Sequence, residues 1–408
     1  MEILIDLGDL RHAVSTCKML SNAVGTINQR PPGLHNDLIQ HLKKLMSRLL
    51  AWYTRPRCES VVRSLDIIVS SFENLQTNLL AMDGRLNQLE RDITALTPSV
   101  QTCMELSGKA NQLWGERAQE RQDQNMSILA WTDSSLVNQL YIHPTISGVA
   151  EDNWLTWVSK KYFPQAVHRA LSIGCGDGCL ERHALQLNIA QYFDAFDASP
   201  GAIEIARKVA KQTGIAHRVR YGVADLNYCH LEPQSYEAAF SSMALHHIRE
   251  LEHTLEQILR SLKPGSLFIL NEFVGPDQFQ WTPTQVRIAN ELLQRIPERY
   301  RKSRRTGALK CEVSRPTRAE MTAGDPTKSI RSSEILPLVS QAFEIVQRVD
   351  YGGTIVNLVL EDIAGNFQWG SEDISILHML FDAEKQLLRE RVIPSDFTLV
   401  IARRPGQD

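Results

Sequence analysis

The sequence has little of what marks membrane, secreted or nucleic-acid-binding proteins. No apolar run reaches the roughly 18 residues that a membrane span needs. The first residues, Met1–Asp6, lack the basic region and the long apolar stretch of a signal peptide. The formal net charge is only −3, from 44 Lys and Arg against 47 Asp and Glu, so no surplus of positive charge points to nucleic acid. These absences predict a soluble protein.

The seven cysteines are odd in number and scattered, which is not the pattern of a disulfide framework. Cys175 and Cys179 lie close together, but no second pair of ligands follows at the spacing of a zinc site. We therefore expect no metal and a reducing, cytoplasmic environment. Hydrophobic residues make up 43% and charged residues 22% of the 408 residues, which is ordinary for a globular chain of two or three domains.

The N-terminal third carries a heptad repeat. Apolar residues fill one seam position at Leu65, Phe72, Leu79, Leu86 and Ile93, and the other at Ile68, Leu75, Met82, Leu89 and Leu96. This regular alternation predicts a coiled coil over residues 61–97, within a helical region that spans residues 1–145. Three interpretations of the seam stay open: self-association, a hairpin folded on its own chain, and docking to a partner enzyme. We expect a homo-oligomer.

From about residue 146 the pattern changes to strands alternating with helices. Residues 171–178 form a short apolar strand followed by glycines at alternate positions, Gly174, Gly176 and Gly178. Glycine permits positive φ and a close approach of ligand, so this turn can face a nucleoside-type cofactor. The third glycine comes one residue earlier than in the dinucleotide fingerprint. The spacing therefore favours S-adenosylmethionine over a dinucleotide.

Further strands are predicted at residues 192–196, 219–223, 238–242 and 266–273, with helical patterns between them. Asp197 ends the first of these strands, 23 residues after the first glycine, where a carboxylate can meet ribose hydroxyls. Ser199 and Pro200 then begin a helix as N-cap and first-turn proline. This order predicts an α/β fold with a doubly wound parallel sheet that binds ligands outside the carboxyl ends of its strands.

The motifs over about residues 150–408 resemble those of the class I S-adenosylmethionine-dependent methyltransferases. They are most similar to the bacterial small-molecule type with Leu-His-His after strand four, which here is Leu245–His247. The resemblance implies a seven-stranded Rossmann-like sheet that ends in an antiparallel pair, matched here by residues 343–351 and 397–403. It also implies a methyltransferase domain at residues 146–408, with insertions at about 276–330 and 354–391.

The resemblance further implies which residues hold S-adenosyl-L-methionine. The loop would hold the methionine end, Asp197 with Ala198 the ribose, and Asp225 with Leu226 the adenine, while Met243 would line the pocket; the loop residues are Gly174, Cys175, Gly176 and Gly178. The family commonly has an acidic residue two positions before the first glycine, whereas this chain has Ser172. That difference puts the usual indirect hold on the amino group of the cofactor in doubt.

A hydroxyl acceptor needs a base, because methyl transfer from a sulfonium is an in-line displacement that leaves the acceptor with a proton to lose. His246 and His247 lie where strand four meets the cleft, and an imidazole can act as a base at neutral pH. Glu272, at the end of the strand at 266–273, competes with them. It can act as the base, orient the acceptor or bond to backbone amides. We expect His247 to be the base, with His246 and Glu272 as alternatives.

The segment at residues 276–330 is too long for a simple connection and is predicted to act as a lid or a substrate-binding element. Residues 295–318 hold nine Arg or Lys against two Glu, and four of the nine are Arg299, Arg301, Arg304 and Arg305. Arginine clusters suit phosphate or carboxylate groups, which favours an anionic acceptor. The alternative is a solvated helix face.

Together these patterns predict a methyltransferase that modifies an oxygen of a glycan or another small metabolite. A dinucleotide-binding oxidoreductase is the enzyme alternative, and the glycine spacing disfavours it. A non-catalytic scaffold or regulatory protein that only binds the cofactor is disfavoured by His247 and Glu272. The Asn-Pro-Pro-aromatic and Pro-Cys motifs of nucleic-acid methyltransferases are absent from the sequence, so we expect no nucleic-acid partner.

Overall fold

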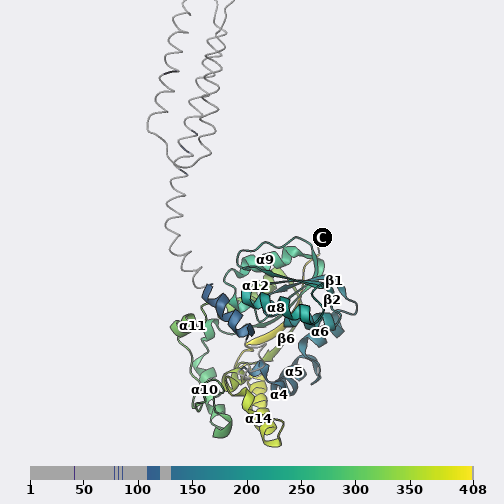
Figure 1. Cartoon of the computed structure of the whole chain (residues 1–408). Coiled ribbons are helices and arrows are strands. Elements are labelled where there is room, and N and C mark those ends of the chain that lie inside the picture. The colour runs from purple at the N-terminus through teal and green to yellow at the C-terminus, as the bar shows by residue number, and fades with distance from the viewer. Residues whose placement is uncertain are drawn as a thin grey trace, which may run out of the picture. The chain divides into compact units, whose positions relative to one another are not determined.

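The computed structural model describes residues 108–119 and 130–406, together with the single positions 41, 78, 81 and 85. The chain divides into two compact units, Met1–Leu96 and Thr97–Asp408. All seam positions of the predicted heptad repeat lie outside the described residues. The second unit contains the predicted sheet, and its labelled elements can be followed in Figure 1.

A seven-stranded mixed sheet has the strand order β3-β2-β1-β4-β5-β7-β6. The strands are β1 (Val167–Ile173), β2 (Ala190–Asp197), β3 (Val219–Val223), β4 (Tyr236–Ser242), β5 (Leu262–Phe273), β6 (Glu344–Gly352) and β7 (Phe397–Arg403). The first five strands are parallel, and β7 runs antiparallel to both β5 and β6. This confirms the predicted fold class, including the closing antiparallel pair. The strand order reverses between β1 and β4, which is where such sheets bind ligands.

The strand register brings the predicted site residues to one edge of the sheet. Ile173 of β1 pairs with Phe196 of β2 and with Ser241 of β4, and Ser242 pairs with Asn271 of β5. The residues that follow these pairs therefore leave the sheet at the same level. They include the first glycine of the loop, the carboxylate at the end of β2 and the histidines after β4.

The helices of the second unit that can be described are α4 (Ser135–Val137), α5 (His143–Ser147), α6 (Trp154–Tyr162), α7 (Cys179–Gln186), α8 (Pro200–Gln212), α9 (Leu251–Ser261), α10 (Pro283–Leu293), α11 (Arg318–Gly324), α12 (Ile335–Ala342), α13 (Ile355–Leu360) and α14 (Ser371–Arg389). Short single turns are η1 (Trp131–Asp133), η2 (Asn138–Ile142), η3 (Leu245–His247), η4 (Asp277–Phe279), η5 (Glu298–Tyr300), η6 (Ser332–Glu334) and η7 (Ala364–Asn366). Residues 108–119 are also helical. We call them the 108–119 helix.

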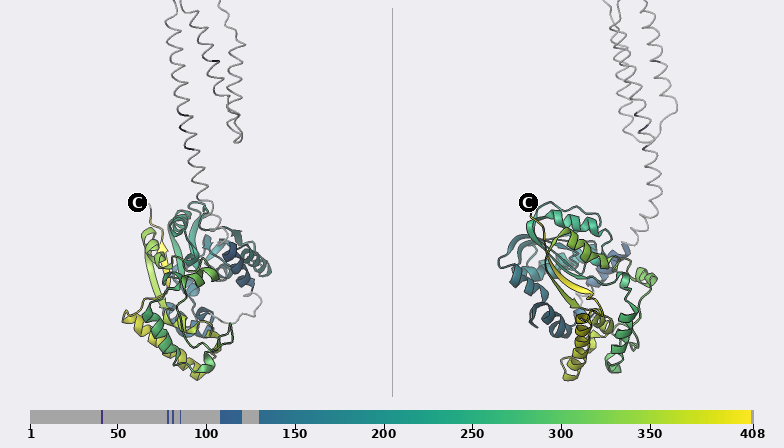
Figure 2. Two further views of the ribbon diagram at one scale, coloured as in Figure 1. Left: turned by 90° about the vertical axis from the view of Figure 1, so that its left-hand side faces the viewer. Right: turned by 180° about the vertical axis from the view of Figure 1, so that it is seen from behind.

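Helices cover both faces of the sheet because neighbouring strand residues point to opposite sides. Phe193 and Phe240 belong to a core cluster that includes residues of α6, α7 and α8. Leu171 and Phe268 belong to a second cluster that includes residues of α9 and α12. In Figures 1 and 2, α10 and α14 lie at the end of this unit away from the C-terminus.

Helix starts in this unit follow local side-chain signals. The Ser199 hydroxyl accepts a hydrogen bond from the amide of Ala202 at 3.3 Å, and Pro200 fills the first turn of α8. This confirms the predicted N-cap. In the 276–330 segment, Thr282 and Gln285 form a reciprocal capping box at α10. The long connection is therefore built of ordered turns and helices.

Residues before the sheet belong to the same core as the C-terminal elements. The ring of Trp131 lies 5.2 Å from that of Phe397, and Tyr141 stacks on Phe381 at 4.7 Å. The Tyr141 hydroxyl donates to the buried carboxylate of Glu384 at 2.6 Å, and this carboxylate also accepts from three amides at the start of α13. The predicted domain boundary after residue 145 falls within α5. It stays a prediction, and this packing favours an earlier boundary.

Candidate active site

The glycine loop joins β1 to α7 in a conformation that its packing requires. The φ angles of Gly174, Gly176 and Gly178 are 66°, 53° and 80°, which side chains with a Cβ disfavour. A Cβ at Gly174 would clash with Ala244, and one at Gly178 would clash with the Tyr221 hydroxyl. A Cβ at Gly176 would meet nothing within 4 Å. Two glycines are thus needed for packing, and the middle one leaves its backbone open to a ligand.

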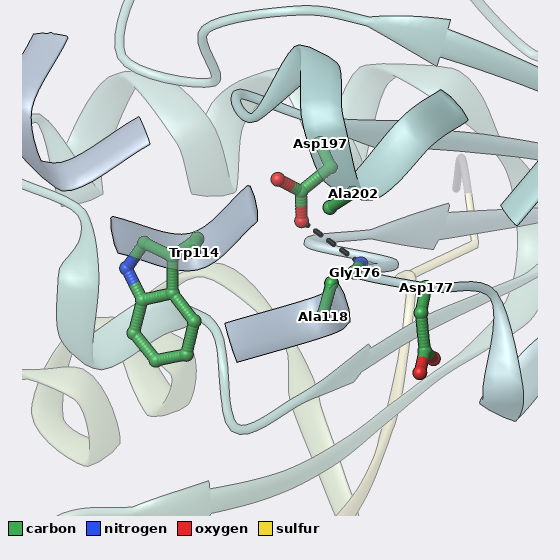
Figure 3. Close-up of a pocket in the computed structure, with 6 residues that line it drawn as sticks. All are labelled: Trp114, Ala118, Gly176, Asp177, Asp197 and Ala202. Atoms are coloured by element: carbon green, nitrogen blue, oxygen red, sulfur yellow. Dashed lines mark hydrogen bonds between the residues drawn. The ribbon is translucent and has the colours of Figure 1, made fainter. Parts of the chain in front are cut away.

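Asp197 connects the end of β2 to this loop. Its Oδ2 accepts from the Gly176 amide at 2.9 Å, which is the dashed line in Figure 3, and its Oδ1 accepts from the Ser199 amide at 2.8 Å. Burial raises the pKa of this carboxyl above its ordinary value. The carboxylate is therefore fixed in direction beside the open backbone of Gly176.

A cavity lies between the glycine loop and the 108–119 helix (Figure 3). Its lining residues are Trp114, Ala118, Gly176, Asp177, Asp197 and Ala202. Its volume is about 40 Å³. Ligand pockets typically measure on the order of 300 to 1,000 Å³. A cofactor of nucleoside size therefore fits at this loop only if the wall formed by Trp114 and Ala118 shifts.

The 108–119 helix packs closely on the start of α8. The Ser199 hydroxyl donates to the Asn111 carbonyl at 2.8 Å. A Cβ on Gly201 would lie 3.1 Å from the Cα of Gly115, so two glycines permit this crossing of backbones. The helix lies in the helical region predicted for residues 1–145, but the sequence analysis did not place it at the cofactor site because it precedes the predicted domain and carries no cofactor motif. The pair of glycines was the available signal.

A buried carboxyl group stands behind the glycine loop. Glu181, in the first turn of α7, is fully buried, and burial raises its pKa to about 7 although the neighbouring Ser172 side chain acts to lower it. Among the described residues, neither of its carboxyl oxygens has a hydrogen-bond partner. The charge of Glu181 also raises the pKa of the Cys175 thiol, after the larger effect of burial. Position 172 lacks an acidic residue, and a neighbouring element supplies a carboxyl group beside it. The sequence analysis missed this residue.

Glu272 and His246 form a buried pair at the ends of β5 and β4. The carboxylate accepts from the amides of Ala244, Leu245 and Phe273 at 2.7–2.9 Å. Its Oε1 lies 2.5 Å from Nδ1 of His246, which donates to it. Burial raises the pKa of Glu272 to about 7 and lowers that of His246 well below its ordinary value. Of the three predicted roles of Glu272, the structure favours bonding to backbone amides.

His247 has one engaged and one unengaged ring nitrogen. The Thr327 hydroxyl donates to Oδ1 of Asp325 at 2.7 Å, so it accepts from Nδ1–H of His247 at 2.9 Å. Nε2 is then the basic nitrogen of a neutral ring, and among residues 108–119 and 130–406 it has no hydrogen-bond partner although it is buried. Burial, followed by the charges of His246, Lys328 and Arg117, lowers the pKa of His247 well below its ordinary value.

Lys328 brings a positive charge to the two histidines. Its Nζ lies 3.4 Å from Nε2 of His246 and 5.8 Å from the ring centres of both Trp114 and Phe279. The Trp114 ring also contacts that of His247, with centres 4.7 Å apart. Residues 325–328 thus bring the long connection next to the histidines, through residues that the sequence analysis did not select, and the role of this segment as a lid or substrate-binding element stays a prediction. No motif marks them.

The other predicted cofactor residues lie at strand ends but outside the small cavity. Asp225 accepts from the backbone and side-chain N–H groups of Asn227 at 2.9 and 2.7 Å. Leu226 is buried in the core, Met243 has a φ of 56°, and Ala198 directly follows Asp197. The roles of Ala198, Asp225, Leu226 and Met243 stay predictions.

The predicted arginine cluster is engaged in structural contacts. Arg299 forms an ion pair with Glu372, and Arg305 bonds to Asp362 at 2.9 Å. The buried Arg301 donates to Gln294 at 3.1 Å, and the Arg304 amide donates to the Asp362 carbonyl at 2.8 Å. These contacts tie the 295–318 segment to residues 361–373. The positive side chains that act on His247 are Lys328 and Arg117 instead.

The described residues lack two kinds of feature. None of their helices is long and apolar enough to cross a bilayer. In the same part of the chain, no three His, Cys, Asp or Glu side chains gather as metal ligands do.

Residues 170–265 match the family profile described as a methyltransferase domain. This segment is a class I S-adenosylmethionine-dependent methyltransferase domain. It contains the glycine loop, Asp197 and both histidines.

Two curated relatives and one solved structure illustrate the similarity. Sterol 24-C-methyltransferase of Candida albicans is 28% identical over 145 residues, 35% of this chain and 38% of that one. Malonyl-[acyl-carrier protein] O-methyltransferase of Brevibacillus brevis is 28% identical over 113 residues, 28% of this chain and 40% of that one. The chain thus spans less than half the length of either relative. Phosphoethanolamine N-methyltransferase 2 of Haemonchus contortus, solved with S-adenosyl-L-methionine, is 17% identical with a TM-score of 0.39, over 62% of this chain and 53% of that one.

Proposed function

We propose that this chain is an S-adenosylmethionine-dependent methyltransferase that modifies a hydroxyl group of a small molecule, such as a glycan or another metabolite. The methyltransferase domain at residues 170–265, the open backbone at Gly176 and the fixed carboxylate of Asp197 support the cofactor. When bound, S-adenosylmethionine supplies an electrophilic methyl group. The loop backbone beside Gly176 and the carboxylate of Asp197 would hold it, and the 108–119 helix would move aside to admit it.

The proposal that the acceptor is a hydroxyl group rests on His247. The chain from Asp325 through Thr327 fixes the proton on Nδ1 and leaves Nε2 free to accept one. A low pKa keeps this nitrogen unprotonated at neutral pH, which is the state that a general base needs. His246 is less suited, because Glu272 and Lys328 engage both of its ring nitrogens.

The relatives leave the acceptor atom open. By name, one modifies carbon 24 of a sterol and the other an oxygen on a malonyl carrier protein. The choice of oxygen therefore rests on His247 alone.

Two measurements test the proposal. Titration calorimetry of the full chain should show S-adenosylmethionine binding in the micromolar range and no comparable binding of NAD. Release of S-adenosylhomocysteine should then be recorded with a panel of sugars, phenols and alcohols. Binding of NAD without S-adenosylmethionine would favour the oxidoreductase. Cofactor binding without turnover on any hydroxyl, amine or thiol compound would favour the non-catalytic scaffold.

The heptads support a second part of the proposal, self-association through residues 61–97. Sedimentation of the full chain should show an oligomer, and Leu79→Asp together with Leu86→Asp should dissociate it by placing charges in the seam. A wild-type monomer at high concentration would favour the hairpin. The scattered cysteines support a cytoplasmic location, which fractionation of the host cell would test.

A further inference from the structure

Lys328 carries a positive charge that no ion pair neutralises among the residues that the structure describes. Its ammonium is half-buried, and among residues 108–119 and 130–406 it makes no ion pair. Its one hydrogen bond goes to the neutral ring of His246. Burial, followed by the charge of Arg117, lowers the pKa of this lysine below its ordinary value. An anion that binds beside such an unpaired, partly buried ammonium would stabilise its charge.

The hydrogen bonds of the nearby carboxylates go to groups other than Lys328. Glu272 accepts three backbone N–H groups as well as His246. Asp325 Oδ1 accepts from the amide and hydroxyl of Thr327, whereas its buried Oδ2, 3.9 Å from Nδ1 of His247, has no hydrogen-bond partner among the described residues. Glu361 also acts on Lys328, but more weakly than Asp325 and Glu272 do. None of these groups completes an ion pair with the ammonium.

Lys328 lies close to His247, the proposed base. The rings of His246 and His247 lie 4.1 Å apart, and Lys328 touches the first of them. Trp114 contacts both His247 and Lys328 and also lines the cavity at the glycine loop. An acceptor whose hydroxyl meets Nε2 of His247 would therefore present a neighbouring group to Lys328, between the aromatic walls of Trp114 and Phe279.

We propose that Lys328 binds an oxyanion of the methyl acceptor, a carboxylate or a phosphate carried on an apolar or aromatic body. This inference rests on the proposed function and names the class of its acceptor. It replaces the arginine cluster at residues 295–318 as the source of acceptor charge recognition. The aromatic walls favour a flat body over a bare ion, and ammonium and oxyanion supply the attraction.

Calorimetry with simple probes tests this on the full chain saturated with S-adenosylhomocysteine. Benzoate carries the charge and the ring, benzamide only the ring, and inorganic phosphate only the charge. Wild type should bind benzoate at least about tenfold more tightly than benzamide, as expected for a charge-assisted contact. Lys328→Met should lose this preference, and Lys328→Arg should keep it within about threefold because the charge remains. Lys208→Met, at an exposed lysine on α8, should behave as wild type.

The outcomes separate the two proposals. Equal benzoate binding by Lys328→Met and wild type, or no preference over benzamide in wild type, overturns this inference. If Lys328→Met does not fold, the same comparison of benzoate with benzamide is made with Lys328→Gln. This variant also removes the charge and should lose the preference that wild type shows. A wild type that binds no S-adenosylhomocysteine overturns the proposed function itself. The ratio of phosphate to benzoate affinity tells which oxyanion the site prefers.

Discussion

The two halves of the candidate site are assembled in different ways. In the cofactor half, the open backbone of Gly176 and the carboxylate of Asp197 come from one stretch of the chain, residues 174–197. In the acceptor half, His247, Glu272 and Lys328 come from three separated stretches, and Trp114 adds a fourth. A short motif therefore specifies the first half, whereas only tertiary contacts create the second. The sequence is a better guide to the cofactor than to the acceptor for this reason.

The largest effect is expected in the acceptor half. His247→Ala should lower kcat by on the order of 10²–10⁴ with little change in cofactor affinity, because it removes the proposed general base. Single-turnover methyl transfer to an acceptor from the hydroxyl panel measures this. His217→Ala, at an exposed histidine, is the matched control. If His247→Ala keeps the rate while Glu272→Gln loses it, the carboxylate is the base.

The pH profile sharpens the same test. The pKa of His247 lies well below 6.5, so the neutral ring is present throughout the range from pH 6.5 to 9. The rate should stay level there and fall only in more acidic solution, as Nε2 becomes protonated. An isolated histidine would instead give a fall centred near its ordinary pKa. Such a fall, absent from His247→Ala, would mean that Nε2 is solvated during turnover.

A pH-dependent stability effect of up to about 3 kcal/mol is expected behind the glycine loop. The pKa of Glu181 is raised from 4.5 to about 7 on folding, so the folded state binds this proton more tightly than the unfolded state does. The stabilisation from the protonated form is present below pH 4.5 and is lost as pH rises through 7. Glu181→Gln carries no such proton. Its melting temperature relative to wild type should therefore rise between pH 5 and pH 8, and a constant difference would contradict the assignment.

In the cofactor half, Asp197→Ala should weaken S-adenosylmethionine binding by about 1–3 kcal/mol through a lost ribose contact and a less ordered loop. Calorimetry measures the affinity, and Asp382→Ala, at an exposed position of α14, controls for a general loss of charge. Unchanged affinity in Asp197→Ala would show that this carboxylate only shapes the loop through the Gly176 amide.

The smallest effect is expected at the 108–119 helix, whose Trp114 and Ala118 form a wall of the cavity at the glycine loop. Gly115→Val should loosen the 108–119 helix from α8, because larger side chains do not fit where the two backbones cross. A shift of about 1 kcal/mol toward the open form would tighten apparent cofactor affinity roughly fivefold. Gly108→Val is the matched control, since a Cβ there would meet nothing within 4 Å. Stopped-flow binding that is equal for both variants would contradict the role of this wall.

The fold was predictable because its signals are local. Strand periodicity, the glycine spacing and the Ser199 cap each occupy a few consecutive residues, and the structure confirms the sheet and the cap. The predicted β3 and β7 agree with the structure at both ends, and the predicted β6 differs by one residue. The carboxyl ends of parallel strands lie at the same edge of the sheet. The positions of His247 and Glu272 at that edge therefore followed from their place in the sequence.

The rest of the site was not predictable, because its chemistry depends on pairing. A sequence shows that Glu272 ends a strand, but not that three amides and His246 occupy its oxygens. It shows charge at residues 295–318, but not that acidic partners at 361–373 engage Arg299 and Arg305 while Lys328 has no ion-pair partner among residues 108–119 and 130–406. Charge density along the chain therefore pointed to the arginines, whereas the proposed anion site at Lys328 depends on tertiary contacts; the role of the arginines stays a prediction.

The carboxylate of Glu384 makes folding of the second unit a collective event. It binds the Tyr141 hydroxyl 243 residues away and the first amides of α13, so one buried group joins segments from both ends of the unit. Closing so long a loop costs conformational entropy before the buried contacts repay it. A nascent chain would therefore hold much of its sheet without a completed core. Slow folding and a need for protection from aggregation until α14 is made are the expected result.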